Sequence, residues 1–106
     1  MRVLLDACVP KGLRRSLSGH EVKTAHEMGW GDLDNGDLLD AMQGAFDALV
    51  TVDKRLPSQQ HIMDRPLGIA VLRANSNRLA DLLPLVPSLL AALSSLKPGT
   101  VEEITG

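Results

Sequence analysis

The chain has 106 residues and a mass of 11.4 kDa, which is enough for one modest hydrophobic core and too little for two. Hydrophobic residues make up 44% of it and charged residues 23%, and no stretch approaches the roughly 18 apolar residues of a membrane span. The formal net charge of −2 argues against a protein that coats nucleic acid through bulk positive charge. We therefore expect a single domain over residues 1–106 that does not enter a membrane.

The N-terminus and the cysteine content indicate the compartment. Asp6 interrupts the apolar N-terminus before a signal-like run develops, and no small-residue cleavage site follows. Cys8 is the single cysteine, so neither an internal disulfide nor a thiolate zinc site can form. These features predict a cytoplasmic protein.

The first predicted elements are a buried strand and a short helix. Residues 2–5 are apolar, and the run stops at Asp6, which is typical of a short buried strand. Leu13 and Leu17 then recur at four-residue spacing with basic residues between them, and Gly19 closes the segment. This pattern predicts a short amphipathic helix with a basic outer face.

The middle of the chain predicts two further strands with a helix between them. Residues 21–25 alternate in polarity, as a second strand would. Asp34 or Asn35 can cap a helix that runs through the following leucines, and Gly44 supplies its stop. Residues 46–52 are predominantly apolar and predict the third strand, again followed by an aspartate.

The last part of the chain predicts two more strands around a leucine-rich region. Residues 54–66 are polar and contain two prolines, which indicates a loop or a distorted helix, and residues 69–72 predict the fourth strand. Two prolines also interrupt residues 78–96, so we expect two helices there, the second beginning near Leu83 with both prolines in its first turn. Residues 100–104 predict a fifth strand at an edge of the sheet.

Strands that alternate with helices imply an α/β fold with a mainly parallel sheet and helices on both faces. Ligands of such sheets bind beyond the carboxyl ends of the strands, where Asp6 and Asp53 are both expected. Mg²⁺ and Mn²⁺ prefer oxygen ligands, and these two carboxylates with one acid from a helix would supply them. A bound ion could polarise a phosphodiester and lower the pKa of an attacking water.

Each acid also has a structural interpretation without chemistry. An aspartate after a strand is often a turn former or the cap of the next helix, which applies to Asp6 and to Asp53 taken singly. Asp37 lies in the first turn of a predicted helix, where the macrodipole favours an acid. Spacing alone therefore leaves both interpretations open.

Several segments carry a resemblance to a known family in the same order along the chain. They are Val3-Leu4-Leu5-Asp6 with Pro10, Gly19-His20-Glu21-Val22, Met28-Gly29-Trp30, Asn35-Gly36-Asp37-Leu38-Leu39, and Phe46 to Lys54. They resemble a small PIN-like family of bacterial domains, which is similar to the PIN-domain nucleases that include VapC-type toxins, and the match runs in order across residues 1 to about 75. The strand end Thr51-Val52-Asp53 is the most specific part of the match.

The resemblance implies a three-layer PIN-like fold, with a mainly parallel sheet of four to five strands flanked by helices. It also implies an acidic site, dependent on Mg²⁺ or Mn²⁺, that hydrolyses RNA phosphodiester bonds. Asp6 matches the first strand-end acid, Asp37 the helix acid and Asp53 the third acid. The chain departs from the pattern at Ala7, where family members often have a second acid, and only Asp64 is in a position to match the fourth acid of full-length PIN nucleases.

Two functions are therefore expected as alternatives. The first is a metal-dependent ribonuclease in which Asp6, Asp37 and Asp53 hold the ion, as the toxin half of a pair with a small antitoxin protein. The second is a catalytically degenerate module that binds RNA or a protein partner without cutting.

The leucine-rich region and the cluster of acids each lead to a physical expectation. Residues 79–96 hold eight leucines and few charges, more apolar surface than one side of a small sheet is expected to cover, so part of this region predicts a homodimer interface. Convergence of three carboxylates would destabilise the metal-free fold by mutual repulsion. On that basis, the replacement Asp53→Asn is predicted to raise the melting temperature in the absence of metal.

Overall fold

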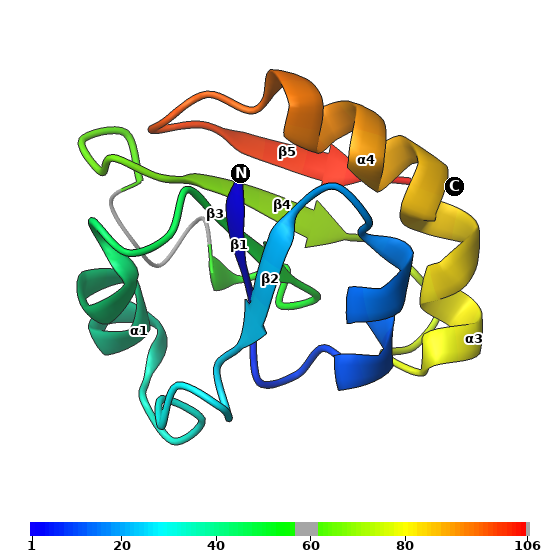
Figure 1. Cartoon of the computed structure of the whole chain (residues 1–106), viewed down its shortest axis with the longest axis horizontal. Coiled ribbons are helices and arrows are strands. Elements are labelled where there is room, and N and C mark those ends of the chain that lie inside the picture. Colours follow the sequence, from blue (N-terminus) through cyan, green and yellow to red (C-terminus); the bar gives the residue numbers. More distant parts are fainter. Residues whose placement is uncertain (57–61, 106) are drawn as a thin grey trace.

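A computed structural model of the chain describes residues 1–56 and 62–105 and contains a five-stranded, entirely parallel sheet (Figure 1). The order of the strands across the sheet is β2-β1-β3-β4-β5. Their bounds are β1 Arg2–Leu5, β2 Glu21–Thr24, β3 Ala48–Thr51, β4 Gly68–Leu72 and β5 Val101–Ile104. The predicted α/β fold with a parallel sheet is confirmed, and so is the position of the last strand at an edge.

Burial along each strand follows its place in the sheet. All residues of β3 and β4 are buried, because both strands have neighbours on each side and helical layers above and below. This explains why their sequences are continuous apolar runs. The edge strand β2 instead alternates between exposed and buried residues.

One face of the sheet is covered by the leucine-rich C-terminal region together with a short helix that follows β1. This layer consists of the 3₁₀ helices η1 (Lys11–Ser16) and η2 (Leu83–Leu85) and the α-helices α3 (Leu79–Leu82) and α4 (Val86–Ser95). Leu13, Leu89 and Leu93 are fully buried in the core that these elements form with β1, β3 and β4. The helix predicted after β1 is thus present, although it adopts the tighter 3₁₀ geometry.

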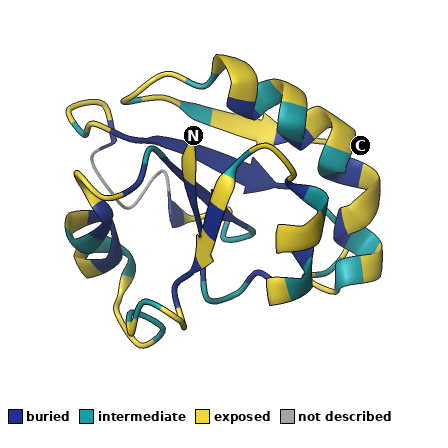
Figure 2. Ribbon diagram, in the orientation of Figure 1, coloured by how far each residue is buried: buried dark blue, intermediate teal, exposed yellow. Residues whose placement is uncertain are grey.

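The other face is covered by α1 (Asn35–Met42) and by the chain on either side of β3 and β4. Leu39 and Met42 of α1 are fully buried against it (Figure 2). Trp30 and Phe46 meet edge to face in the same layer, with ring centroids 6.0 Å apart. The molecule therefore has the three layers, helix on sheet on helix, that the sequence predicted.

The C-terminal helical region is divided at its two prolines, because a proline has no N–H group to donate inside a helix. Pro84 lies in the first residues of η2 and Pro87 in the first turn of α4, so neither removes a hydrogen bond from a helix interior. The predicted division into two helices is confirmed. The second α-helix begins at Val86, three residues after the predicted start, because η2 occupies the intervening turn.

Most of the eight leucines of residues 79–96 turn out to cover the sheet. Four are buried, three more pack against the same core, and Leu83 alone among them is an exposed large hydrophobic residue, at 43%. The expected surplus of apolar surface is therefore wrong, since this region has a full sheet face to cover. The homodimer stays a prediction, but the leucines of residues 79–96 no longer support it.

Residues 57–61, within the segment predicted as a loop or distorted helix, lie outside the described residues. In the part of the chain that is described, the longest helix, α4, has 10 residues, and no helix is long and apolar enough to cross a bilayer.

Candidate functional site

The strand order reverses direction between β1 and β3, and the candidate site lies at that point. From β1 the chain crosses to β2 on one side, and β3 then pairs with β1 on the other side. Parallel sheets of this order bind ligands at such a reversal, beyond the carboxyl ends of the two strands. Asp6 follows β1 directly and Asp53 follows β3 by two residues, so both predicted strand-end acids lie at this edge.

The carboxylate of Asp6 is buried and held at both oxygens. The residue is 9% exposed, and its backbone N–H donates to the carbonyl of Val50 at 2.9 Å, which continues the pairing of β1 with β3. Its Oδ1 accepts the N–H of Ala7 at 2.8 Å, and its Oδ2 accepts the hydroxyl of Thr51 at 2.7 Å. These contacts define one orientation for the side chain.

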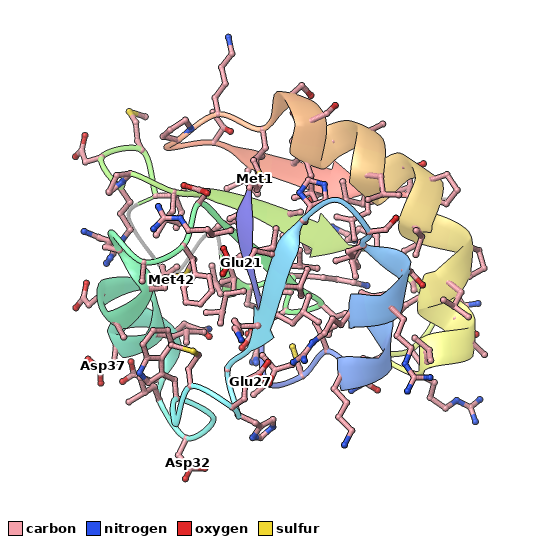
Figure 3. The ribbon with its side chains drawn as sticks, viewed as in Figure 1. Met1, Glu21, Glu27, Asp32, Asp37 and Met42 are labelled. Carbon is pink, nitrogen blue, oxygen red and sulfur yellow. The ribbon has the colours of Figure 1, made fainter. Side chains whose placement is uncertain are left out.

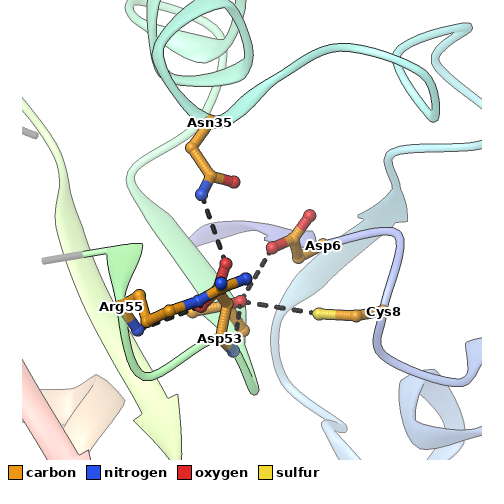
Figure 4. A network of polar contacts seen from close by, with 6 residues as sticks. Asp6, Cys8, Asn35, Asp53 and Arg55 are labelled. Atoms are coloured by element: carbon orange, nitrogen blue, oxygen red, sulfur yellow. Dashed lines mark hydrogen bonds and ion pairs between the residues drawn. The ribbon is translucent and has the colours of Figure 1, made fainter. Parts of the chain in front are cut away.

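Thr51, the last residue of β3, joins the two acids (Figure 4). Its fully buried hydroxyl donates to Asp6 and accepts the backbone N–H of Asp53 at 3.0 Å. The Sγ of Cys8 contacts the same oxygen at 3.6 Å. A single hydroxyl therefore couples the orientation of the first acid to the backbone that carries the second.

Asp53 is held by two elements. Its Oδ2 accepts the side-chain amide of Asn35, at the start of α1, at 3.3 Å, and its Oδ1 accepts the backbone N–H of Arg55 at 2.9 Å. The Nε of Arg55 forms an ion pair with the same oxygen at 3.5 Å. Burial acts to raise the pKa of Asp53, but these hydrogen bonds and the charge of Arg55 outweigh it, so the pKa lies below its ordinary value.

This shift contradicts the expected electrostatic strain at Asp53. Mutual repulsion among carboxylates would raise the pKa of Asp53, whereas the structure lowers it. The physical reason is that Asn35 and Arg55 supply donors and a positive charge that the sequence analysis did not assign to this residue. The predicted rise in melting temperature for Asp53→Asn therefore loses its basis.

Asp37 lies apart from the hydrogen-bonded group. It is an exposed residue in the first turn of α1, and its backbone N–H donates to the capping carboxylate of Asp34 at 2.8 Å (Figure 3). Within the described ranges, no hydrogen bond joins its side chain to Asp6 or Asp53, and no three residues of the types His, Cys, Asp and Glu form a group that could hold a metal ion. Asp6 and Asp53 are thus linked, and Asp37 is not.

Asp64, the positional candidate for a fourth acid, lies at the opposite edge of the sheet. It belongs to the turn that precedes β4, next to Met63, whose carbonyl approaches Gly99 ahead of β5. The neighbouring Arg65 forms an ion pair with Asp40 of α1. The amino ends of β4 and β5 meet here, so Asp64 is remote from the acids at the carboxyl ends.

The thiol of Cys8 is a poor nucleophile in this setting. Burial and, next, the negative charge of Asp6 raise the pKa of Cys8 above its ordinary value. The thiol is therefore neutral at pH 7, and only the thiolate is reactive. Cys8 instead helps to fix the loop after β1, since its carbonyl accepts the side-chain amide of Asn77 at 3.0 Å.

The donor set at the strand ends suits a hard divalent cation. An ionised carboxylate has about four acceptor sites, and the hydrogen bonds described for Asp6 and Asp53 leave lone pairs free on both. Mg²⁺ is commonly bound through one or two carboxylates, with water and substrate phosphate completing its shell. The chemistry of Asp6 and Asp53 therefore fits such an ion.

Sequence reasoning identified the acids and missed what orients them. The sequence predicts Asp34 or Asn35 as the helix cap; Asp34 performs that role, and the side-chain amide of Asn35 donates to Asp53. The signal for Thr51 was present in the sequence: a hydroxyl residue at the end of an otherwise apolar strand, two positions before an acid, needs a buried partner.

No protein-family model, curated protein or solved structure matches this chain. The resemblance to PIN-like domains therefore stays a prediction, and the site is described by its own geometry.

Proposed function

We propose that this protein is a ribonuclease that depends on Mg²⁺ or Mn²⁺, with Asp6 and Asp53 as the residues that hold the ion. The observation that supports this proposal is the buried hydroxyl of Thr51, which joins the carboxylate of Asp6 to the backbone N–H of Asp53 at the reversal between β1 and β3. A linkage of this kind sets the two acids in a fixed relation before any ligand binds, as an ion-binding pair requires.

Each side chain has a distinct role in this proposal. When bound, the ion supplies an activated water and a charge that polarises the scissile phosphodiester. Thr51 keeps the carboxylate of Asp6 in a single orientation, and Asn35 does the same for Asp53. Arg55, with its side chain 79% exposed beside Asp53, supplies a positive charge for a phosphate oxygen of the substrate.

A second candidate is a module that binds RNA or a protein partner without cutting, and one observation favours it. Asp53 is already neutralised by the ion pair with Arg55, and Asp37 is not linked to the other two acids. An ion would have to compete with the guanidinium for Asp53, which weakens metal binding.

Cleavage assays separate the two candidates. A panel of RNAs should be cut by the purified protein with Mn²⁺, and Asp53→Asn should lose this activity because the ion lacks one of its two carboxylates. Asp37→Asn serves as the comparison and should retain most of it, since its side chain is exposed and unlinked. If the unmodified protein cuts no faster than Asp53→Asn, the non-catalytic module is the correct function.

We further propose that such an enzyme acts on cytoplasmic RNA and is held inactive by a small antitoxin protein. Induced expression in a bacterial host should arrest growth, and Asp53→Asn should not. An arrest that Asp53→Asn reproduces would show toxicity unrelated to this site.

A further inference from the structure

The 3₁₀ helix η1, in the segment that follows Asp6, lines a basic cavity that has no role in the proposed function. The cavity has a volume of about 350 Å³ and is lined by Lys11, Gly12, Arg14 and Arg15. Three of these four residues are cationic and none is acidic. Gly12 allows the close approach of Leu79 of α3, whose Cδ2 would lie 3.0 Å from a Cβ at this position.

Two of the three cations have no partner among the described residues. Lys11 and Arg15 are exposed and form neither a hydrogen bond nor an ion pair through their side chains. Positive charge that is concentrated around a cavity without a carboxylate attracts anions.

Arg14 is fixed in place by the end of β2. It forms an ion pair with Glu27, and the same carboxylate accepts the backbone N–H of Thr24 at 2.7 Å. The hydrogen bond from the Thr24 N–H, opposed by burial, and the charge of Arg14 lower the pKa of Glu27. The carboxylate is therefore ionised at neutral pH and holds one wall of the cavity in position.

These contacts bring the cavity to the same edge of the sheet as the acids. Thr24 is the register partner of Leu5, and the N–H of Ala25 donates to the Leu5 carbonyl at 2.9 Å. Asp6 is the next residue after Leu5, and Glu27, which holds Arg14, follows the end of β2 by three residues, so Asp6 and this wall of the cavity belong to the carboxyl ends of adjacent strands. In Figure 1, η1 stands beside the end of β2.

We propose that this cavity, formed by Lys11, Arg14 and Arg15, binds the phosphate backbone of single-stranded RNA next to the strand-end acids. The inference rests on the proposed function, because it concerns how the same substrate is held. Phosphate contacts of this type position a nucleic acid without reading its sequence. Lys11 and Arg15 are the two cations left for adjacent phosphates, since the charge of Arg14 is paired with Glu27.

The test measures binding without hydrolysis. The full chain is titrated in EDTA against a fluorescent single-stranded RNA of about ten nucleotides, and anisotropy is followed over a range of salt concentrations. Replacing both cations, Lys11→Ala with Arg15→Ala, should weaken binding about tenfold and reduce the slope of log affinity against log salt by about 1.4, since each lost phosphate contact accounts for about 0.7. Single replacements should fall between.

Lys97→Ala is the matched control. Lys97 is an exposed lysine in the turn before β5, at the opposite edge of the sheet, and its loss should leave both affinity and slope unchanged. All replaced side chains are exposed, so thermal melts of the variants should coincide with that of the unmodified protein.

Three results would overturn the proposal. The first is equal binding by the double variant and Lys97→Ala. The second is displacement of the RNA by inorganic phosphate as effectively as by unlabelled RNA, which would assign the cavity to free phosphate. The third is displacement by polyglutamate as effectively as by RNA, which would assign it to an acidic protein partner. EDTA removes the metal, so this measurement reports binding without cleavage. If the protein binds RNA here but cuts no RNA in the Mn²⁺ assay, the proposed enzyme is refuted and the proposed binding site is kept.

Discussion

At the scale of single residues, the hydroxyl of Thr51 is the contact on which the candidate site depends most. It is fully buried, donates to Asp6 and accepts from the backbone of Asp53. We expect Thr51→Val to destabilise the protein by about 1–3 kcal/mol, because the buried carboxylate and N–H lose their partner while the side-chain volume is kept. Thr51→Ser retains the hydroxyl and should recover most of the loss in denaturant unfolding. Equal stability of all three proteins would show that the hydroxyl is not needed to hold the acids.

Asp53 gives a second prediction, with the opposite sign to the one drawn from the sequence. Burial acts to raise its pKa, but the hydrogen bonds from Arg55 and Asn35 dominate and lower it. Ionised Asp53 therefore stabilises the fold at pH values above its unfolded pKa, and this stability is lost as pH falls through the folded pKa. Asp53→Asn should consequently melt at a lower temperature than the unmodified protein in EDTA at neutral pH.

The same two proteins should also differ in how their melting temperatures respond to divalent metal. If Asp6 and Asp53 hold an ion in the native state alone, excess Mn²⁺ should raise the melting temperature of the unmodified protein by mass action, while Asp53→Asn should gain much less. Thermal melts of both proteins, with EDTA and with Mn²⁺, measure both effects. If Mn²⁺ moved neither protein, Asp53 would be a structural residue only.

The same residues show where sequence reasoning ends. The position of an aspartate after an apolar strand predicts the edge of the sheet at which it lies, and Asp6 and Asp53 are both there. Position does not predict the partners of a side chain. Asn35 and Arg55 reach Asp53 through folded loops, and these contacts set the sign of its pKa shift.

At the scale of elements, α1 shows how a cap supports the site. Asp34 accepts the N–H of Asp37 at 2.8 Å, and this cap fixes the turn from which Asn35 reaches Asp53. We expect Asp34→Ala to cost about 1 kcal/mol of unfolding free energy, the usual loss for an N-cap. Asp32→Ala is the matched control, because Asp32 is an exposed aspartate just before the helix (Figure 3). Chemical denaturation should separate the two variants, and identical midpoints would assign no stabilising role to the cap.

Helix types were harder to predict than helix positions. Leu13 and Leu17 mark the buried side of η1 correctly, but spacing of four residues is compatible with α and 3₁₀ geometry over such a short segment. The prolines of the C-terminal region were more informative, since their missing N–H groups permit only helix starts. A residue such as proline, which forbids a conformation, therefore constrains a secondary-structure prediction more strongly than a residue such as leucine, which only favours one.

At the scale of the whole molecule, a contact between distant residues joins the beginnings of β1 and β3. Asp47 accepts the backbone N–H of Arg2 at 2.8 Å and forms an ion pair with its guanidinium at 3.1 Å. The side-chain hydrogen bond from Arg2, followed by the backbone hydrogen bond, lowers the pKa of Asp47. Its contribution to stability is therefore present above the unfolded pKa and is lost as pH falls through the lowered folded pKa.

The measurement is the difference in unfolding free energy between the unmodified protein and Asp47→Asn across acid pH. We expect a difference at neutral pH that is small, because both side chains are more than 40% exposed, and that vanishes in acid. A difference independent of pH would mean that the ionised form of Asp47 is not what stabilises the fold.

The architecture as a whole was the most predictable property of the chain. The alternation of strands and helices requires crossovers, and crossovers require a parallel sheet with two covered faces, as found. The order of the strands was not predicted, because local patterns do not specify which strands become neighbours. The leucines of residues 79–96 show the same limit, since their number alone predicts a dimer surface and does not tell how much of the sheet they cover.

The pairing of β1 with two later strands has a consequence for how the chain acquires its binding site. During synthesis β1 can first pair only with β2, and its other edge stays open until β3 (Ala48–Thr51) has been made. Closing so long a loop is entropically costly and slow compared with forming local helices. The hydroxyl of Thr51 reaches Asp6 only when that loop has closed. A ligand held by both acids thus selects chains whose central sheet is finished, and partly folded chains cannot compete for it.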